Sequence, residues 1–407
     1  MHRAGPSRLG HGGSDLAARW PEARTRHARG GGRLRRLSAR PAARLVLVAL
    51  GIFLCWFPWS MGQSLTAPGT DNVPSRIAEW ARNHYLGPLV TLGESISYQP
   101  PKVGGKPSFA LTGPRSATAR RLKHARATSI RPDAPPSLAS LVGKPLPGEG
   151  VWRVLGAVRG VPALYGTYIR PDSLHTSYVA GVVSMDQRLL RFGLHPGIED
   201  PGPANWRVPP TIPPRSRRRL LATFNGGFKI DSSDGGFYLN GITAGTLTNG
   251  AASLVFYRDG RLAVGVWGRG LHMAADVVGV RQNLRPIVDH GIVPATVDRN
   301  IKSSWGATLG GGYYVWRSGV GITSDGRIVY VYGPALTVRT LADLLRRAGC
   351  VEAMQLDINP EWMSFMSYRP KPAGADPAPV NLLPDQQQPP DRYYSVSSRD
   401  FTAVYAR

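Results

Sequence analysis

Cysteine is scarce in this chain, which has 407 residues but only two cysteines, Cys55 and Cys350. Cys55 lies inside a long apolar run, so Cys350 is the only thiol of the part that follows, and no disulfide can form within that part. The fold must therefore depend on a hydrophobic core. The length suffices for one large domain or two ordinary ones.

Several short catalytic motifs are also missing. The chain has no HExxH, GxSxG, P-loop or CxxC sequence, which removes the enzyme classes that are easiest to recognise. The segment from Asp231 to Ile242 resembles a calcium loop, but Ile242 stands where a bidentate glutamate is required. A hairpin or active-site loop is the favoured interpretation. No motif in the sequence requires a cofactor. Binding of a divalent cation near Asp231 and Asp234 is an alternative that the sequence leaves open.

Acidic residues are few, with 26 Asp and Glu against 50 Lys and Arg. This balance implies an anionic partner. Residues 1–44 hold eleven arginines and no lysine against two acids, and with their Gly, Pro and Ala they predict a disordered tail. The chain shows no nucleic-acid reading motif, so we expect anionic lipid and an anionic glycan as partners, and no nucleic acid.

One long apolar run, residues 45–65, carries no charge. As a helix it would be roughly 31 Å long, about the thickness of a bilayer's hydrocarbon core. With the arginines on its N-terminal side, it predicts a single-pass plasma-membrane anchor with a cytoplasmic N-terminus and an extracytoplasmic C-terminal part. A cleaved signal peptide, twin-arginine export and a buried helix of a soluble core are the alternatives.

The remaining chain falls into two regions of different composition. Residues 66–136 predict a juxtamembrane helix around residues 77–81, followed by a linker rich in Pro, Gly, Ser, Lys and Arg. Residues 137–407 predict one domain of the α+β class, mainly a mixed β-sheet with a few packed helices. Asp259-Gly260 and Asp325-Gly326 each separate two strand-like runs and predict hairpin turns. A helix is expected from Thr337 to Gly349, followed by a buried strand that ends at Asp357.

Three features could carry chemistry. Asn225, Gly226 and Gly227 follow an apolar strand, where the backbone can approach a ligand closely. Arg317 lies among strand residues, where a guanidinium needs a phosphate or carboxylate partner. Asp357 ends a buried strand. Each feature also has a plain structural explanation: a turn, a solvent-facing arginine and a capping aspartate.

Their order resembles the phosphodiester glycosidase family over residues 215–370. That family shows an Asn-Gly-Gly-Phe turn, an arginine strand that leads through Asp-Gly to a second strand, and a Thr-capped helix followed by a strand with an acid at its end. Here Phe224 to Phe228 match the first element, Arg317 matches the arginine, and Thr337 to Asp357 keep the helix and strand spacing without a gap.

The resemblance implies an enzyme that breaks the bond between a sugar's anomeric carbon and a phosphate oxygen. Arg317 and the backbone after Asn225 would then hold the phosphate, while Asp357 would stabilise the cationic sugar. Asn240, in the Asn-Gly pair that follows, would be a further binding residue. For a second acid, Asp231, Asp234 and Glu361 are the candidates.

The chain departs from the family directly after Asp357. The family's three glycines are replaced by Ile358-Asn359-Pro360, and Pro360 has no N–H to offer an anion. Glu361 could supply a carboxylate, while Asn359 and Trp362 could contact a sugar. The sequence therefore predicts a membrane-anchored glycosidase acting on a cell-envelope glycan. A non-catalytic envelope protein that binds anionic polysaccharide is the alternative.

Overall fold

The computed structural model describes residues 41–112, 134–299, 301–308, 311–372 and 374–407. Most of the predicted tail and of the predicted linker lies outside these residues. The chain divides into two compact units, Met1–Ser60 and Met61–Arg407.

The apolar run forms the helix α2, Pro41–Leu65, which begins before the predicted residue 45 because Pro41 and the two alanines after it also suit a helix. Its side chains are not buried within the protein. Within the described part of the chain, α2 is the one helix that is long and apolar enough to cross a membrane.

The second unit contains three sheets, and every pairing between their strands is antiparallel in the described residues. The first sheet has seven strands, in the order β1 (Arg153–Val158), β2 (Val161–Ile169), β3 (Ala180–Met185), β13 (Ile328–Leu336), β12 (Val315–Thr323), β14 (Cys350–Gln355) and β11 (Pro286–Val288). The turn at Asp325-Gly326 joins β12 to β13 as predicted, with Gly326 in the left-handed region at φ 82°.

The other two sheets have five strands each. The second sheet has the order β7 (Ile242–Ala244), β6 (Phe237–Leu239), β10 (Val277–Gln282), β8 (Ala252–Tyr257) and β9 (Leu262–Val266). The third has the order β16 (Ala378–Asn381), β15 (Phe365–Arg369), β5 (Leu220–Asn225), β17 (Phe401–Ala406) and β4 (Leu190–His195). The predicted turn at Asp259-Gly260 joins β8 to β9. The α+β class with mainly β structure is thus confirmed.

One large core joins the three sheets. Val183 of the first sheet, Phe256 of the second and Phe224 of the third belong to the same buried cluster. The ring of Phe224 lies 5.0 Å from that of Tyr330 on β13, which fixes the third sheet against the first. Short helices and 3-10 turns complete the loops: α6 (Pro214–Arg217), α7 (Lys302–Trp305), Ile230–Ser232, Ala295–Asp298 and Arg392–Tyr394.

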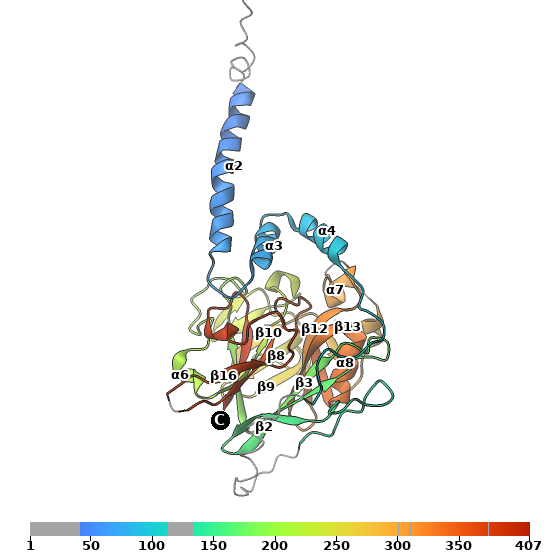
Figure 1. Ribbon diagram of the computed structural model, residues 1–407. Coiled ribbons are helices and arrows are strands. Elements are labelled where there is room, and N and C mark those ends of the chain that lie inside the picture. Colours follow the sequence, from blue (N-terminus) through green and yellow to red (C-terminus); the bar gives the residue numbers. More distant parts are fainter. Residues whose placement is uncertain (1–40, 113–133, 300, 309–310, 373) are drawn as a thin grey trace, which may run out of the picture. The chain divides into compact units, whose positions relative to one another are not determined.

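The helix α8, Val338–Arg347, forms as the sequence predicts. Thr337 caps it by accepting from the Thr340 N–H, and Thr340 returns a bond to the Thr337 N–H. Leu341, Leu344 and Leu345 are fully buried in a cluster with residues of the first sheet. The ribbon of α8 lies next to this sheet (Figure 1). The helix therefore fixes the strand that follows it, β14, and the residues at the end of that strand.

The helices α3 (Val73–Asn83) and α4 (Gly87–Ser97) form a hairpin in the predicted juxtamembrane segment. Arg82 of α3 and Glu94 of α4 form an ion pair. Contacts with the β domain hold the hairpin: Tyr98 donates to the Tyr314 carbonyl at 3.1 Å, and Asn72 donates to the Glu361 carboxylate at 2.7 Å. This segment is therefore part of the domain surface.

Replacing Leu341 with alanine is expected to lower the free energy of unfolding by about 2–5 kcal/mol, because the cavity left in a fully buried site cannot collapse completely. Urea unfolding of the detergent-solubilised full chain, followed by tryptophan fluorescence, measures this. Arg346→Ala on the exposed side of the same helix is the control, with an expected change within about 0.5 kcal/mol. Equal effects of the two variants would contradict the packing described for α8.

Candidate active site around Asp357

Asp357 lies two residues beyond the end of β14 and is held by β12. Its N–H donates to the Ser318 hydroxyl at 3.1 Å, and the Ser318 N–H donates to the Asp357 carbonyl at 2.9 Å. The carboxylate oxygen Oδ1 accepts from the N–H groups of Ile358 at 2.7 Å and Asn359 at 2.9 Å. The position of the carboxylate is therefore fixed by backbone on both sides.

Asp357 lines a cavity of about 510 Å³. The cavity wall carries charges of both signs. Its cations are Arg82, Lys229, Lys302 and Arg399, and its acids besides Asp357 are Glu79 and Glu94. Trp362 adds an aromatic wall. Such a mixture suits a ligand that combines an anionic group with a polar ring.

Burial raises the pKa of Asp357 from its ordinary 3.8 to about 6, although Arg399, the two backbone N–H groups and Arg281 oppose the shift. The carboxyl is 4% exposed. Loss of hydration disfavours the charged form, and the surrounding donors recover only part of that loss. The group therefore changes its charge close to neutral pH, as carboxyls that take part in chemistry often do.

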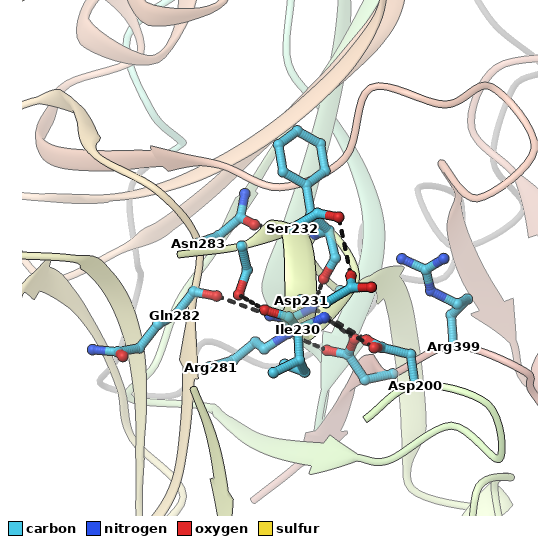
Figure 2. A network of polar contacts seen from close by, with 12 residues as sticks. Asp200, Ile230, Asp231, Ser232, Arg281, Gln282, Asn283 and Arg399 are labelled. Atoms are coloured by element: carbon cyan, nitrogen blue, oxygen red, sulfur yellow. Dashed lines mark hydrogen bonds and ion pairs between the residues drawn. The ribbon is translucent and has the colours of Figure 1, made fainter. Parts of the chain in front are cut away.

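A buried network of arginines and carboxylates lies beside this cavity (Figure 2). Arg281 of β10 is fully buried and donates to both oxygens of Asp400, at 3.0 and 3.1 Å. Its guanidinium also lies 3.7 Å from Asp200, which accepts from the Ile230 N–H at 2.9 Å. Burial raises the pKa of Asp400 even with Arg281 against it. Arg399 interacts electrostatically with Asp357, Asp200 and Asp400.

The Asn-Gly-Gly turn supports this network from inside the protein. The Asn225 amide donates to the Gly226 carbonyl at 2.8 Å and to the Ser318 hydroxyl at 3.0 Å. Its carbonyl oxygen accepts from the Tyr330 hydroxyl and the Ser364 N–H. Both the NH2 group and the carbonyl oxygen of the Asn225 side chain thus have hydrogen-bond partners within the protein. Asn225 therefore positions Ser318, which in turn holds Asp357, and does not face a ligand.

The two glycines allow close approach of the same network. A Cβ on Gly226 would lie 2.1 Å from the Asp400 carboxylate, and one on Gly227 would lie 3.1 Å from the Asn283 amide. Asn283 joins the turn to the end of β14, because it accepts from the Phe228 N–H and donates to the carbonyls of Gln355 and Leu356. No motif in the sequence indicates Asn283 as a site residue.

Arg317 is not brought to Asp357. Its guanidinium donates to the Leu336 carbonyl at 3.0 Å and to the Gln355 side chain at 2.8 Å, and burial lowers its pKa to about 10. Neighbouring residues of a strand point to opposite faces, and Ser318 takes the face of Asp357. Arg317 is not among the residues that line the Asp357 cavity, whereas Arg399, which lies just before β17, is one of them.

The other predicted residues are divided among several cavities. Asn359 and Trp362 line the Asp357 cavity. Glu361 lines a neighbouring cavity of about 260 Å³ and accepts from Asn72 and Gln388. Asn240, at φ 49°, lies in a third cavity beside the turn between β6 and β7. Asn240 is thus separate from the Asp357 cavity, whereas the cavity of Glu361 adjoins it and shares Asn359 and Trp362 with it.

Asp231 and Asp234 line a further cavity of about 600 Å³, together with Glu199 and Asp200. In the part of the chain that the structure describes, they are not part of a close group of metal-ligand side chains. Among the described residues, such a group is formed by Asp289, His290 and Glu352, whose ligand atoms lie within 4.8 Å of one another.

Glu79 of α3 enters the Asp357 cavity from a segment that the sequence indicated only as a juxtamembrane helix. Its carboxylate forms an ion pair with Lys229 and lies 3.6 Å from the Arg399 guanidinium. Glu79 is buried, and no motif marks it in the sequence. Its place in the cavity follows only from the packing of α3 against the β domain.

The β-rich domain thus holds a buried carboxylate in one cavity with several cationic side chains. The phosphodiester glycosidase family model matches residues 218–357, from the start of β5 to Asp357, and confirms the family resemblance seen in the sequence.

Distant similarity extends to solved structures. The catalytic domain of zebrafish N-acetylglucosamine-1-phosphodiester alpha-N-acetylglucosaminidase, described as auto-inhibited by pro-peptide, shares 14% identity at a TM-score of 0.38, covering 63% of this chain and 88% of that one. A hypothetical protein from Synechocystis shares 12% identity at a TM-score of 0.32, covering 61% of this chain and 63% of that one. An exported protein from Burkholderia pseudomallei shares 10% identity at a TM-score of 0.32, covering 56% of this chain and 74% of that one. No curated protein matches the chain significantly.

Asp357→Asn is expected to remove a pH dependence of stability. The pKa of Asp357 is raised in the folded protein to about 6, so between about pH 4 and 6 the folded state holds a proton that the unfolded state releases. Stability from this group is therefore present at low pH and lost as pH rises. Relative to wild type, the variant should gain roughly 2 kcal/mol between pH 4 and pH 7.

Urea unfolding of both proteins at pH 4, 5, 6 and 7 measures the difference. A difference that stays constant or shrinks as pH rises would contradict a raised pKa at Asp357.

Proposed function

We propose that this protein is a membrane-anchored extracytoplasmic hydrolase that cleaves the bond between a sugar's anomeric carbon and phosphate in an anionic glycan or glycoconjugate of the cell envelope. The family match supports the reaction class. The observation that carries the proposal is the Asp357 carboxylate in one cavity with Lys229 and Arg399. The charge-free helix α2 and the arginine-rich segment before it support the anchoring and its orientation.

In this reaction the sugar gains positive charge while the phosphate departs. A phosphate leaves readily without strong acid assistance, so the protein mainly needs to hold it and to stabilise the sugar. Lys229 and Arg399 are placed to bind the phosphate oxygens. Asp357, ionised above about pH 6, is placed to stabilise the cationic sugar or to activate water. Trp362, whose ring lies against the Arg392 and Arg399 guanidinium groups, would form the apolar floor of the site.

Glu79 occupies the proposed phosphate position in this structure. Its carboxylate pairs with Lys229 and lies near Arg399, as a phosphate would. The zebrafish relative is described as auto-inhibited by its pro-peptide. In this chain α3 would act similarly, and Glu79 would have to release the two cations before a substrate phosphate binds.

Non-catalytic binding of an anionic polysaccharide is the second candidate. One observation favours it: the N–H groups of Ile358 and Asn359 already donate to Asp357, and Pro360 has none, so this turn has no N–H groups left for a phosphate among those three residues. A retained fold with cationic side chains in its cavity could then serve binding alone.

Asp357→Asn is expected to lower kcat for a sugar 1-phosphodiester by about 100-fold or more, because a charge that stabilises the transition state is lost. Turnover by the full chain in detergent micelles, across a panel of sugar 1-phosphodiesters, measures this. Glu361→Gln is the matched control, since Glu361 lies in the neighbouring cavity and should leave kcat largely unchanged. For the wild type, kcat/KM should fall below about pH 6 as Asp357 is protonated.

Two results together would contradict the enzyme and support the binding protein. These are absence of turnover across the whole panel, and polysaccharide binding that survives Asp357→Asn and weakens steeply with salt.

Glu79→Gln is expected to tighten the binding of a sugar 1-phosphate by roughly tenfold, because the competing charge is removed from Lys229 and Arg399 while the helix contact is kept. Calorimetric titration of the full chain measures this affinity. Glu94→Gln is the control, because Glu94 lines the same cavity but pairs with Arg82. Unchanged or weaker binding in Glu79→Gln would show that Glu79 does not compete with phosphate.

A further inference from the structure

The helix α4 presents an apolar face that the protein leaves uncovered. Leu89, Leu92 and Ile96 are 64%, 58% and 78% exposed, and their spacing places them on one side of the helix. Tyr85, in the turn before α4, is 96% exposed. Large apolar side chains gathered in this way mark a surface that contacts a partner or a lipid.

The opposite side of α4 faces the protein and carries the half-buried Val90 together with polar residues. Thr91 and Glu94 line the Asp357 cavity, and Glu94 pairs with Arg82 of α3. A helix that covers a hydrophobic core has the reverse arrangement, with its apolar side inward. The apolar side of α4 therefore has no role in packing the domain.

The hairpin of α3 and α4 begins at Val73, a short loop of residues 66–72 after the end of the apolar helix α2. Arg76 of α3 donates to the carbonyls of Ser64 at 3.3 Å and Leu65 at 3.2 Å, and the Ser64 hydroxyl donates to the Arg76 carbonyl at 3.2 Å. Arg76 also donates to the Ala67 and Gly69 carbonyls. These bonds lie within the unit that begins at Met61, and they hold α3 beside Ser64 and Leu65, the last two residues of the apolar helix.

We propose that the outer face of α4, formed by Leu89, Leu92 and Ile96, inserts into the interface of the same bilayer that α2 spans. This inference rests on the proposed membrane anchoring. Amphipathic helices of this kind lie in the plane of the membrane with their apolar side at the boundary between headgroups and acyl chains. The inner side of the hairpin, with Glu79 and Glu94, then holds one wall of the Asp357 cavity at the membrane surface, where sugar phosphates carried by lipids or by polymers near the membrane are presented.

The test uses the full chain reconstituted in phosphatidylcholine vesicles, with an environment-sensitive fluorophore on Leu92→Cys in a Cys55→Ala background. Cys350 should stay unlabelled, because it is 2% exposed and burial raises the pKa of its thiol. Native Cys55, within α2, reports anchoring when labelled in the otherwise unchanged chain. Ser324→Cys, in the exposed turn between β12 and β13, is the water-facing control in the Cys55→Ala background.

The expected result is blue-shifted emission at residue 92 that is quenched by lipids with a spin label near the headgroup, together with quenching at Cys55 by labels deep in the bilayer and none at residue 324. High salt should leave the signal at residue 92 unchanged, because the contact is apolar. With the probe on Ile96→Cys instead, adding Leu89→Ser and Leu92→Ser should abolish the quenching.

Quenching at Cys55 with a water-like signal at residue 92 would overturn this inference and leave the anchor intact. A blue-shifted probe at residue 92 that no lipid label quenches would also overturn it, since a second copy of the chain would then cover the face. Loss of quenching at both positions would overturn the anchoring itself, and the inference with it.

Discussion

A buried group of charges lies where the three sheets meet, and the candidate site depends on it. Arg281 comes from β10 of the second sheet, Asp400 directly precedes β17 of the third, and Asp357 follows β14 of the first. Charges removed from water are costly unless they are paired and hydrogen-bonded, so each sheet must be in place for the others' charges to be satisfied. The pairing does not fully offset the loss of hydration, so burial raises the pKa of Asp400 and raises that of Asp357 to about 6. The raised pKa thus follows from the packing of the fold.

The segment that follows the apolar helix supplies one wall of the Asp357 cavity. Glu79 reaches the cavity from α3, and Arg82, Thr91 and Glu94 complete that wall. The same hairpin is tied to the end of α2 through Arg76. Under the proposals made above, one short segment would connect the membrane anchor, the cover of the phosphate position and the lipid-facing surface.

The sequence predicts elements well where the signal is local. The turns at Asp259-Gly260 and Asp325-Gly326, the Thr337 cap and the buried strand before Asp357 all depend on neighbouring residues. Arg317 is different, because nearly every residue of β12 is buried and polar alternation therefore does not reveal which face points to Asp357. Glu79 and Arg399 lie 278 residues before and 42 residues after Asp357 in the chain. Only the tertiary packing of the chain brings Glu79 and Arg399 close to Asp357, and no sequence motif indicates this proximity.

The binding of a sugar 1-phosphate to Lys229→Gln and Arg317→Lys, each compared with wild type by calorimetric titration of the full chain, tests the central claim most directly. Lys229 is partly exposed, with 22% of its side chain accessible, so its replacement should preserve the fold. The account predicts that Lys229→Gln weakens binding by roughly tenfold or more, while Arg317→Lys binds as the wild type does. Loss of binding in Arg317→Lys with normal binding in Lys229→Gln would contradict it and return the phosphate to the arginine first indicated by the sequence.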